Sequence, residues 1–234
     1  MYHLVRITAR DEWKTSFHTC YSSYKWLVMP FSLTNAPAVF QRFINTVFAD
    51  LLDVSVVVYL DDIPIFSEDK ASHEEHVQEV LQHLHKHGLY AKPEKCKFNT
   101  KSTEYLRYQL SPTGLTISFD KVWTILDWPE PQKVKNVQSF LSFANFYHYF
   151  IYNYSDIVTL LTHLTHKGVP WTFTNSCHTT FQQLKEVFTS APILIHWVPD
   201  TPMIVKTDAS DYAITGILSI GCTNKEIQLV TYYS

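Results

Sequence analysis

Two adjacent aspartates, Asp61 and Asp62, lie between two apolar runs in the stretch VVVYLDDIPIFS, residues 56–67. Neighbouring carboxylates repel each other unless a cation lies between them. Mg²⁺ prefers oxygen ligands of this kind and keeps positions open for substrate phosphates. The pair therefore predicts metal-assisted phosphoryl transfer, although the dipeptide taken alone is more often the polar turn of a hairpin.

The apolar run before the aspartates predicts the strand that presents them. Residues 54–60, VSVVVYL, are apolar at both alternating positions, as in a central strand covered on both faces. A tight turn at Asp61 and Asp62 would let both carboxylates face one point, whereas neighbours in a regular strand face opposite ways. Pro64 in the outgoing strand has no N–H to donate, which predicts a weakened ladder there.

Helices are predicted on both sides of this strand pair. Residues 35–52 carry apolar side chains at helical spacing and have a proline near the start, which is typical of a first helical turn. Residues 72–88 predict a second helix, with Ser72 and Glu75 as its capping box and Gly88 at its end.

The rest of the chain alternates between segments with the periodicity of a helix and segments with the periodicity of a strand. Polar turns and a change of period near the Pro-rich residues 196–202 suggest a boundary between two lobes. The pattern predicts short strands at 95–98 and 103–111, helices at 119–128, 135–151, 155–168 and 177–192, and further strands at 202–221 and 225–234.

Composition narrows the classes of protein that fit. The chain has 234 residues, 46% of them hydrophobic, and a net charge of −3, so any nucleic-acid partner must be recognised at a local site. Its four cysteines are scattered, which argues against a disulfide framework. No apolar run is long enough to span a membrane, and the N-terminus has no signal-peptide core. We therefore expect no membrane partner and an intracellular location, in the cytoplasm or nucleus.

The chain has 12 histidines and only 5 glycines. His83, His85 and His87 are spaced by two within a predicted helix, so their rings point to different faces. A solvated helix face is a better interpretation of these three histidines than a metal site.

The order and spacing of several segments resemble the reverse transcriptases of gypsy-type LTR retrotransposon polyproteins. The last segment resembles the opening of the adjoining RNase H domain. The resemblance implies an α+β fold: a partial palm with fingers over residues 1–112, a helical thumb and connection over 113–198, and the first strands of an RNase H-like domain over 199–234. The segments are LVMPFSLTNAPAVFQRFIN, VVVYLDDIPIFSED, SHEEHVQEVLQHL, LYAKPEKCKF, YLRYQLSPTGL, ILDWPEPQKVKNVQSFLSFANFYHYFI and TDASDYAITGILS.

The resemblance also implies roles for individual residues. Asp61 and Asp62 match the Mg²⁺-binding catalytic carboxylates of the polymerase site, and Asp208 matches the first metal ligand of the RNase H site. The implied partners are an RNA or DNA template-primer and deoxynucleoside triphosphates. The residues that match nucleotide or template-primer contacts are Tyr59, Phe31, Ser32, Pro37, Gln41, Lys95, Leu106 and Arg107.

Lys95 has two interpretations. It resembles the lysine proposed to protonate the departing pyrophosphate. It also belongs to a local cluster with Lys92, Lys97 and Lys101, which is the best candidate for a patch that contacts phosphates.

Several departures from the family pattern predict a degenerate, shortened copy. The third polymerase carboxylate would lie upstream of Tyr2, and the partners of Asp208 would lie beyond Ser234. Ser32, Arg107 and Ser142 stand where the family usually has glycine. With a metal ligand missing, we expect this chain to be inactive in isolation.

Two alternatives to an inactive polymerase fragment remain open. The chain could be a non-catalytic module that binds nucleic acid or another partner. It could also be a piece of a longer polyprotein that is active as a whole.

Overall fold

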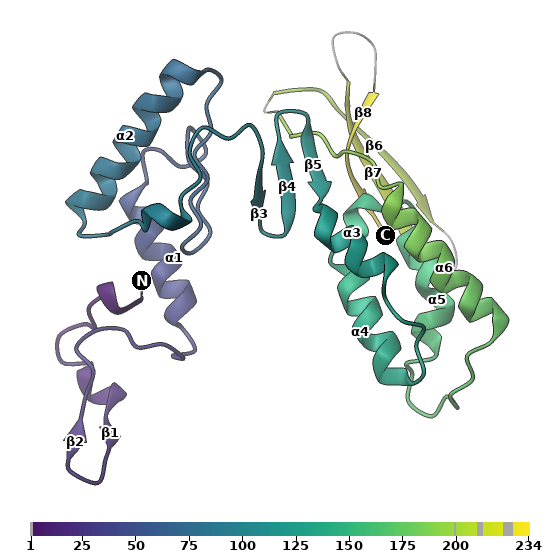
Figure 1. Ribbon diagram of the computed structural model, residues 1–234, viewed down its shortest axis with the longest axis horizontal. Helices are drawn as coiled ribbons and strands as arrows, with labels where there is room; N and C mark the ends of the chain where they lie inside the picture. The colour runs from purple at the N-terminus through teal and green to yellow at the C-terminus, as the bar shows by residue number, and fades with distance from the viewer. Residues whose placement is uncertain (1, 199, 210–212, 222–226) are drawn as a thin grey trace. The chain divides into compact units, whose positions relative to one another are not determined.

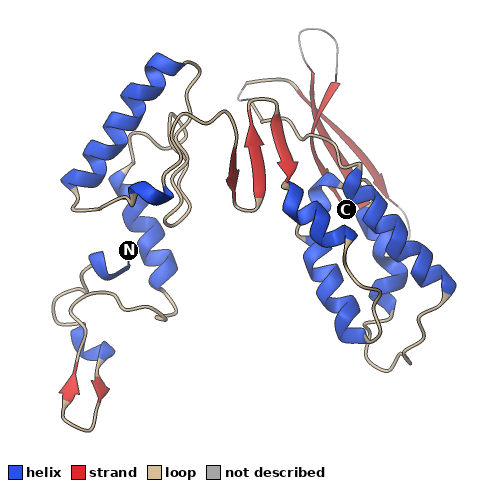
Figure 2. Cartoon of the chain, viewed as in Figure 1, coloured by secondary structure: helices blue, strands red, loops and turns tan. Residues whose placement is uncertain are grey.

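The computed structural model describes residues 2–198, 200–209, 213–221 and 227–234. It divides into two compact units, Met1–Asn99 and Thr100–Ser234, which are described separately. Helices and antiparallel sheets occupy separate stretches of the chain, so the predicted α+β class is confirmed (Figure 2). None of the helices in the described ranges combines the length and hydropathy needed to cross a membrane.

The first unit is built mainly on two helices (Figure 1). A small antiparallel pair of strands, β1 and β2, precedes them, with Phe17 opposite Tyr24. The elements are 3-10 turns η1 (Tyr2–Leu4) and η2 (Glu12–Thr15), strands β1 (Phe17–His18) and β2 (Ser23–Tyr24), helices α1 (Ala36–Val47) and α2 (Lys70–Lys86), and 3-10 turn η3 (Pro93–Lys95).

Helix α2 begins earlier than the sequence pattern predicts. Asp69 is the N-cap, and its Oδ1 accepts hydrogen bonds from the backbone amides of Ala71 at 2.8 Å and Ser72 at 3.0 Å. The predicted start at a Ser72–Glu75 capping box is therefore wrong, because a carboxylate three residues upstream already accepts from the free amides of the first turn. The predicted end is confirmed: Gly88 has a φ of 66°, and the Leu89 amide donates to the Leu84 carbonyl.

Residues 54–60 do not form the predicted central strand. Only Val56 of the valine run is fully buried, and Tyr59 is half exposed. Within the described residues this segment pairs through isolated bridges alone, such as Val56 with Ile65. The strand predicted at 95–98 is also wrong, because Pro93 starts a 3-10 turn and the Cys96 amide bonds back to the Pro93 carbonyl.

The second unit contains two antiparallel three-stranded sheets, in the orders β3-β4-β5 and β6-β7-β8, with helices between them in the chain. The four helices predicted between residues 119 and 192 are present, although the one predicted at 135–151 ends at Asn145 and a separate 3-10 turn follows at His148–Phe150. Residues 103–111 form two strands rather than one, and the strand Gly114–Ile117 was not predicted. Strands are present within 202–221 and 225–234, of which residues 210–212, 225 and 226 lie outside the described residues. The elements are β3 (Thr103–Tyr105), β4 (Tyr108–Ser111), β5 (Gly114–Ile117), α3 (Phe119–Leu126), α4 (Val134–Asn145), η4 (His148–Phe150), α5 (Tyr154–His163), α6 (Asn175–Thr189), β6 (Met203–Ala209), β7 (Ile214–Gly221) and β8 (Ile227–Tyr233).

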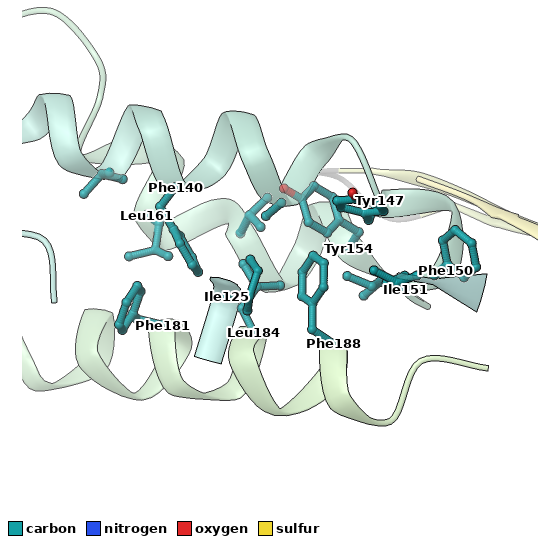
Figure 3. Close-up of a cluster of buried hydrophobic side chains, with 14 of the residues drawn as sticks. Ile125, Phe140, Tyr147, Phe150, Ile151, Tyr154, Leu161, Phe181, Leu184 and Phe188 are labelled. Atoms are coloured by element: carbon teal, nitrogen blue, oxygen red, sulfur yellow. The ribbon is translucent and has the colours of Figure 1, made fainter. Parts of the chain in front are cut away.

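Aromatic side chains fill the core between helices α3 to α6. Figure 3 shows Phe140 and Phe181 facing each other, and their ring centroids are 4.6 Å apart. Tyr147 packs edge-on against Phe188 at 6.0 Å. The β6-β7-β8 sheet joins the same unit, since the Ile195 amide donates to the Leu229 carbonyl of β8 at 2.9 Å. Burial of this apolar surface is the main source of stability in this unit.

Candidate active site

The two aspartates lie at a tight turn, but the turn is one residue earlier than predicted. Tyr59 and Asp62 exchange two backbone hydrogen bonds, each 3.0 Å long, so Leu60 and Asp61 are the two central residues. Leu60 has a φ of 54°, a left-handed conformation that a leucine seldom adopts. Asp61 therefore lies at the apex, and Asp62 is the first residue of the outgoing arm.

Gln41 of α1 holds this turn in place. Its side-chain carbonyl accepts a hydrogen bond from the Leu60 amide at 2.7 Å, and its Nε2 donates to the Val58 carbonyl at 3.1 Å. The same Nε2 lies 2.8 Å from Oδ1 of Asn45, one turn further along α1. One side chain therefore satisfies two backbone groups of the incoming arm and fixes the turn against the helix.

Pro64 weakens the outgoing arm, as its position in the sequence predicts. The Val57 amide donates to the Pro64 carbonyl at 3.0 Å, but the proline has no N–H with which to return the bond. Further from the turn, the Phe66 amide donates to the Ser55 carbonyl at 2.9 Å. The arms are thus joined on both sides of a gap, which explains why they form bridges rather than a continuous ladder.

The aspartate carboxylates are available to a ligand. Both side chains are exposed, and no hydrogen bond or ion pair joins either carboxylate to another described residue. Within the described ranges no group of three or more His, Cys, Asp or Glu side chains is arranged to hold a metal ion. Two adjacent, free carboxylates still fit Mg²⁺, which binds proteins through one or two carboxylates and completes its shell with water and phosphate oxygens.

The other predicted residues of the first unit lie on different elements. Pro37 is exposed in the first turn of α1, and Tyr59 precedes the turn with half of its surface exposed. Phe31 borders a surface hollow of about 530 Å³ that is also lined by Lys14 and Trp26. Neither aspartate lines this hollow.

Ser32 has a φ of 74°, a left-handed conformation that glycine adopts most easily. This conformation explains why the family usually has glycine at the position of Ser32.

Lys95 is exposed on η3. Lys92 and Lys97 of the first unit are exposed as well, and so is Lys101 of the second unit, so each of these lysines is accessible by itself.

The remaining predicted residues belong to the second unit. Leu106 and Arg107 form the β3-β4 turn with φ values of 49° and 70°, so Arg107 also stands where the backbone favours glycine. The Arg107 guanidinium lies 5.3 Å from the ring centroid of Phe146, and the Tyr147 hydroxyl donates to the Arg107 carbonyl. Asp208 is exposed on β6, and its Oδ1 accepts from the Ala209 amide at 2.9 Å.

Two family models match separate stretches of the chain. Residues 1–110 match the family described as reverse transcriptase (RNA-dependent DNA polymerase), and residues 173–234 match the RNase H-like domain found in reverse transcriptase. The chain belongs to the reverse transcriptases. The paired aspartates and Gln41 all lie within the matched residues of the first region.

Relatives of this reverse transcriptase chain are the Tf2-3 and Tf2-4 transposon polyproteins of Schizosaccharomyces pombe. Each is 33% identical over 233 residues, which is 100% of this chain and 18% of the polyprotein. The chain therefore corresponds to a fragment of a retrotransposon polyprotein and spans about a fifth of the length of these relatives.

Solved structures share the fold of this reverse transcriptase chain. A foamy viral protease-reverse transcriptase in complex with double-stranded DNA superposes with a TM-score of 0.84 at 23% identity, over 97% of this chain and 40% of the viral one. A second, in complex with an RNA/DNA hybrid, gives a TM-score of 0.83 over 97% of this chain and 31% of the viral one.

Sequence reasoning missed the structural part that Gln41 plays. The resemblance assigned Gln41 to template or nucleotide contact, whereas its side-chain amide forms hydrogen bonds with the backbone of residues 58 and 60. A signal was present, since Gln41 lies between Phe40 and Ile44, two apolar positions of the buried side of α1, and is itself partly buried. A polar side chain in such a position usually has a backbone partner.

Proposed function

We propose that this chain supplies the paired carboxylates of an RNA-directed DNA polymerase site that works with Mg²⁺. The supporting observation is the pair of free, exposed aspartates on a turn that Gln41 fixes, in a region that matches reverse transcriptases. Bound Mg²⁺ would stabilise charge on the transferring phosphoryl group. Asp61 and Asp62 would each offer carboxylate oxygens to the ion, and Gln41 would hold the turn that carries them.

We propose the following contacts for the other residues that match the family pattern. Tyr59, Phe31, Ser32 and Pro37 would border the nucleotide and template. Lys95 would meet phosphates, Leu106 and Arg107 would contact the primer, and Asp208 would begin an RNase H site. The proposed partners are a template-primer duplex and deoxynucleoside triphosphates. The foamy viral reverse transcriptases, solved with double-stranded DNA and RNA/DNA hybrid, support a duplex partner.

By the family resemblance, the polymerase site uses a third carboxylate in addition to Asp61 and Asp62. We therefore propose that the isolated chain does not extend primers and that the activity belongs to a longer polyprotein of the gypsy type. The protein would act inside the cell, where element RNA is copied.

Primer extension tests the polymerase proposal. The 234-residue chain, and the same chain within a full-length polyprotein, would be given a primed RNA template, nucleotides and Mg²⁺. We expect extension by the polyprotein and none by the isolated chain. Asp61→Asn and Asp62→Asn should each abolish extension in the polyprotein, whereas Asp53→Asn, at an exposed aspartate of the preceding loop, should retain it. Full extension by the Asp61→Asn and Asp62→Asn variants would refute the metal role.

A second candidate function is nucleic-acid binding without catalysis. It is favoured by the four exposed lysines Lys92, Lys95, Lys97 and Lys101, none of which forms an ion pair with another described residue. If the isolated chain binds an RNA/DNA hybrid through them, the logarithm of affinity should fall linearly with the logarithm of salt concentration. Replacing Lys95 and Lys97 by glutamine should reduce that slope, and an absence of binding at low salt would exclude this function.

A further inference from the structure

A second cluster of possible ligands lies where the outgoing arm of the aspartate hairpin meets α2. Ser67 follows Phe66, the last residue of that arm with a backbone bond to the incoming one. His73 and His76 lie three residues apart in the first two turns of α2, on one face of the helix. The Ser67 Oγ is 2.7 Å from Nδ1 of His76 and 3.2 Å from Nδ1 of His73.

The geometry brings the same ring nitrogen of both histidines to one point. All three side chains are half-buried, so their positions are restricted by their surroundings. A serine hydroxyl has one proton and can donate it to only one of the two nitrogens. Its oxygen also has two lone pairs, so a histidine that does not accept this proton must carry a proton on Nδ1 and donate it to Oγ. A cation would remove this requirement, because it can accept lone pairs from both nitrogens.

The local charge also suits a cation. Asp69 lies at the N-cap of the same helix. Hydrogen bonds from the backbone and side chain of Ser72 lower the pKa of Asp69, which favours its ionised form. An anion therefore lies at the N-cap, four residues before His73, where it would offset the positive charge of a bound ion.

We propose that His73 and His76 bind a divalent transition-metal ion of the zinc, copper and nickel class through their Nδ1 atoms. The Ser67 hydroxyl would hydrogen-bond to a water on the metal, and further waters would complete the shell. Imidazole nitrogens are suitable ligands for these metals and poor ones for Mg²⁺, so the site is chemically distinct from Asp61 and Asp62. An occupied site would join the end of the aspartate hairpin to the start of α2.

Calorimetric titration of the purified 234-residue chain with Zn²⁺ near neutral pH tests this proposal. We expect one equivalent to bind, and His73→Ala and His76→Ala each to weaken binding by at least about tenfold. His85→Ala is the matched control, because His85 is an exposed histidine of the same helix, and it should leave the affinity unchanged. Unchanged affinity in both His73→Ala and His76→Ala would overturn the proposal.

Two further measurements keep the test independent of variant folding and of the polymerase proposal. In the unaltered chain, small amounts of Cu²⁺ should broaden the ring NMR signals of His73 and His76 before those of the other histidines. Earlier broadening at His163 and His166, whose rings are 5.6 Å apart, would count against the site. Asp61→Asn with Asp62→Asn should leave zinc affinity unchanged, and a loss in that variant would show that zinc binds at the aspartates instead.

Discussion

The side-chain carbonyl of Gln41 lies 2.7 Å from the backbone nitrogen of Leu60 and ties α1 to the turn that carries Asp61. Leu60 is held there with a φ of 54°, so this bond helps to offset the cost of a left-handed leucine. A residue two turns into a helix thus controls the position of carboxylates about twenty residues later in the sequence.

Gln41→Leu should destabilise the chain. The substitution leaves the Leu60 amide and the Val58 carbonyl without their side-chain partner, and each unpaired group costs about 1–3 kcal/mol when shielded from water. Urea denaturation should therefore give a free energy of unfolding that is lower by about 2 kcal/mol. Gln82→Leu, at an exposed glutamine of α2, should change it by less than about 0.5 kcal/mol. Equal effects in the two variants would contradict the role of Gln41.

Ser32→Gly should stabilise the chain. Ser32 has a φ of 74°, and a left-handed conformation costs an L-residue about 1–2 kcal/mol, whereas glycine adopts it freely. Because glycine also loses more entropy on folding, we expect a net gain of about 0.5–1 kcal/mol in the same denaturation measurement. Ser32→Ala keeps the Cβ and should give no gain, so a similar gain in both variants would show that backbone strain is not the cause.

Ser55→Ala should also stabilise the chain. The Ser55 side chain is almost fully buried, at 1% exposure, and its hydroxyl has no hydrogen-bond partner among the described residues. Removing an unsatisfied buried hydroxyl recovers part of a desolvation cost of about 1–3 kcal/mol. Thermal unfolding should shift to higher temperature, while Ser102→Ala, at an exposed serine, should leave the midpoint unchanged. A lower midpoint for Ser55→Ala would mean that the hydroxyl has a stabilising partner.

Stability should fall in strong alkali, and Tyr147 should contribute to the fall. Burial raises the pKa of Tyr147 from 10.0 to about 12. The folded state therefore holds its proton when the unfolded state has lost it. The stabilisation is complete below pH 10.0 and disappears as the pH rises towards about 12.

Tyr147→Phe should make this alkaline loss of stability shallower. Denaturation at several pH values between neutrality and pH 11 would measure the slope, with Tyr21→Phe as a control at a tyrosine that is 90% exposed. Burial also raises the pKa of Tyr108, Tyr154 and Tyr232, so part of the slope should remain. An unchanged slope in Tyr147→Phe would show that Tyr147 ionises equally easily in both states.

Long periodic segments could be predicted from the sequence, whereas the start of a helix and the pairing between segments could not. Helix α2 is a clear case: its apolar face and its end at Gly88 are local properties, but its start depends on whether Asp69 or Ser72 caps it. Both side chains can accept from backbone amides, so composition alone does not separate them. His83 was predicted to lie on a solvated face, yet it is half-buried against Phe48, with Nε2 3.3 Å from Asp50.

The sequence by itself determined the chemistry that the chain can offer: two adjacent carboxylates, a proline that interrupts their strand, and ordered motifs that resemble reverse transcriptases. The tertiary structure decided that Leu60 and Asp61 form the apex, that Gln41 holds it, and that His73 and His76 meet at Ser67. Residue type and spacing are local, but these contacts join segments that only folding brings within hydrogen-bond distance, and no periodicity encodes that distance.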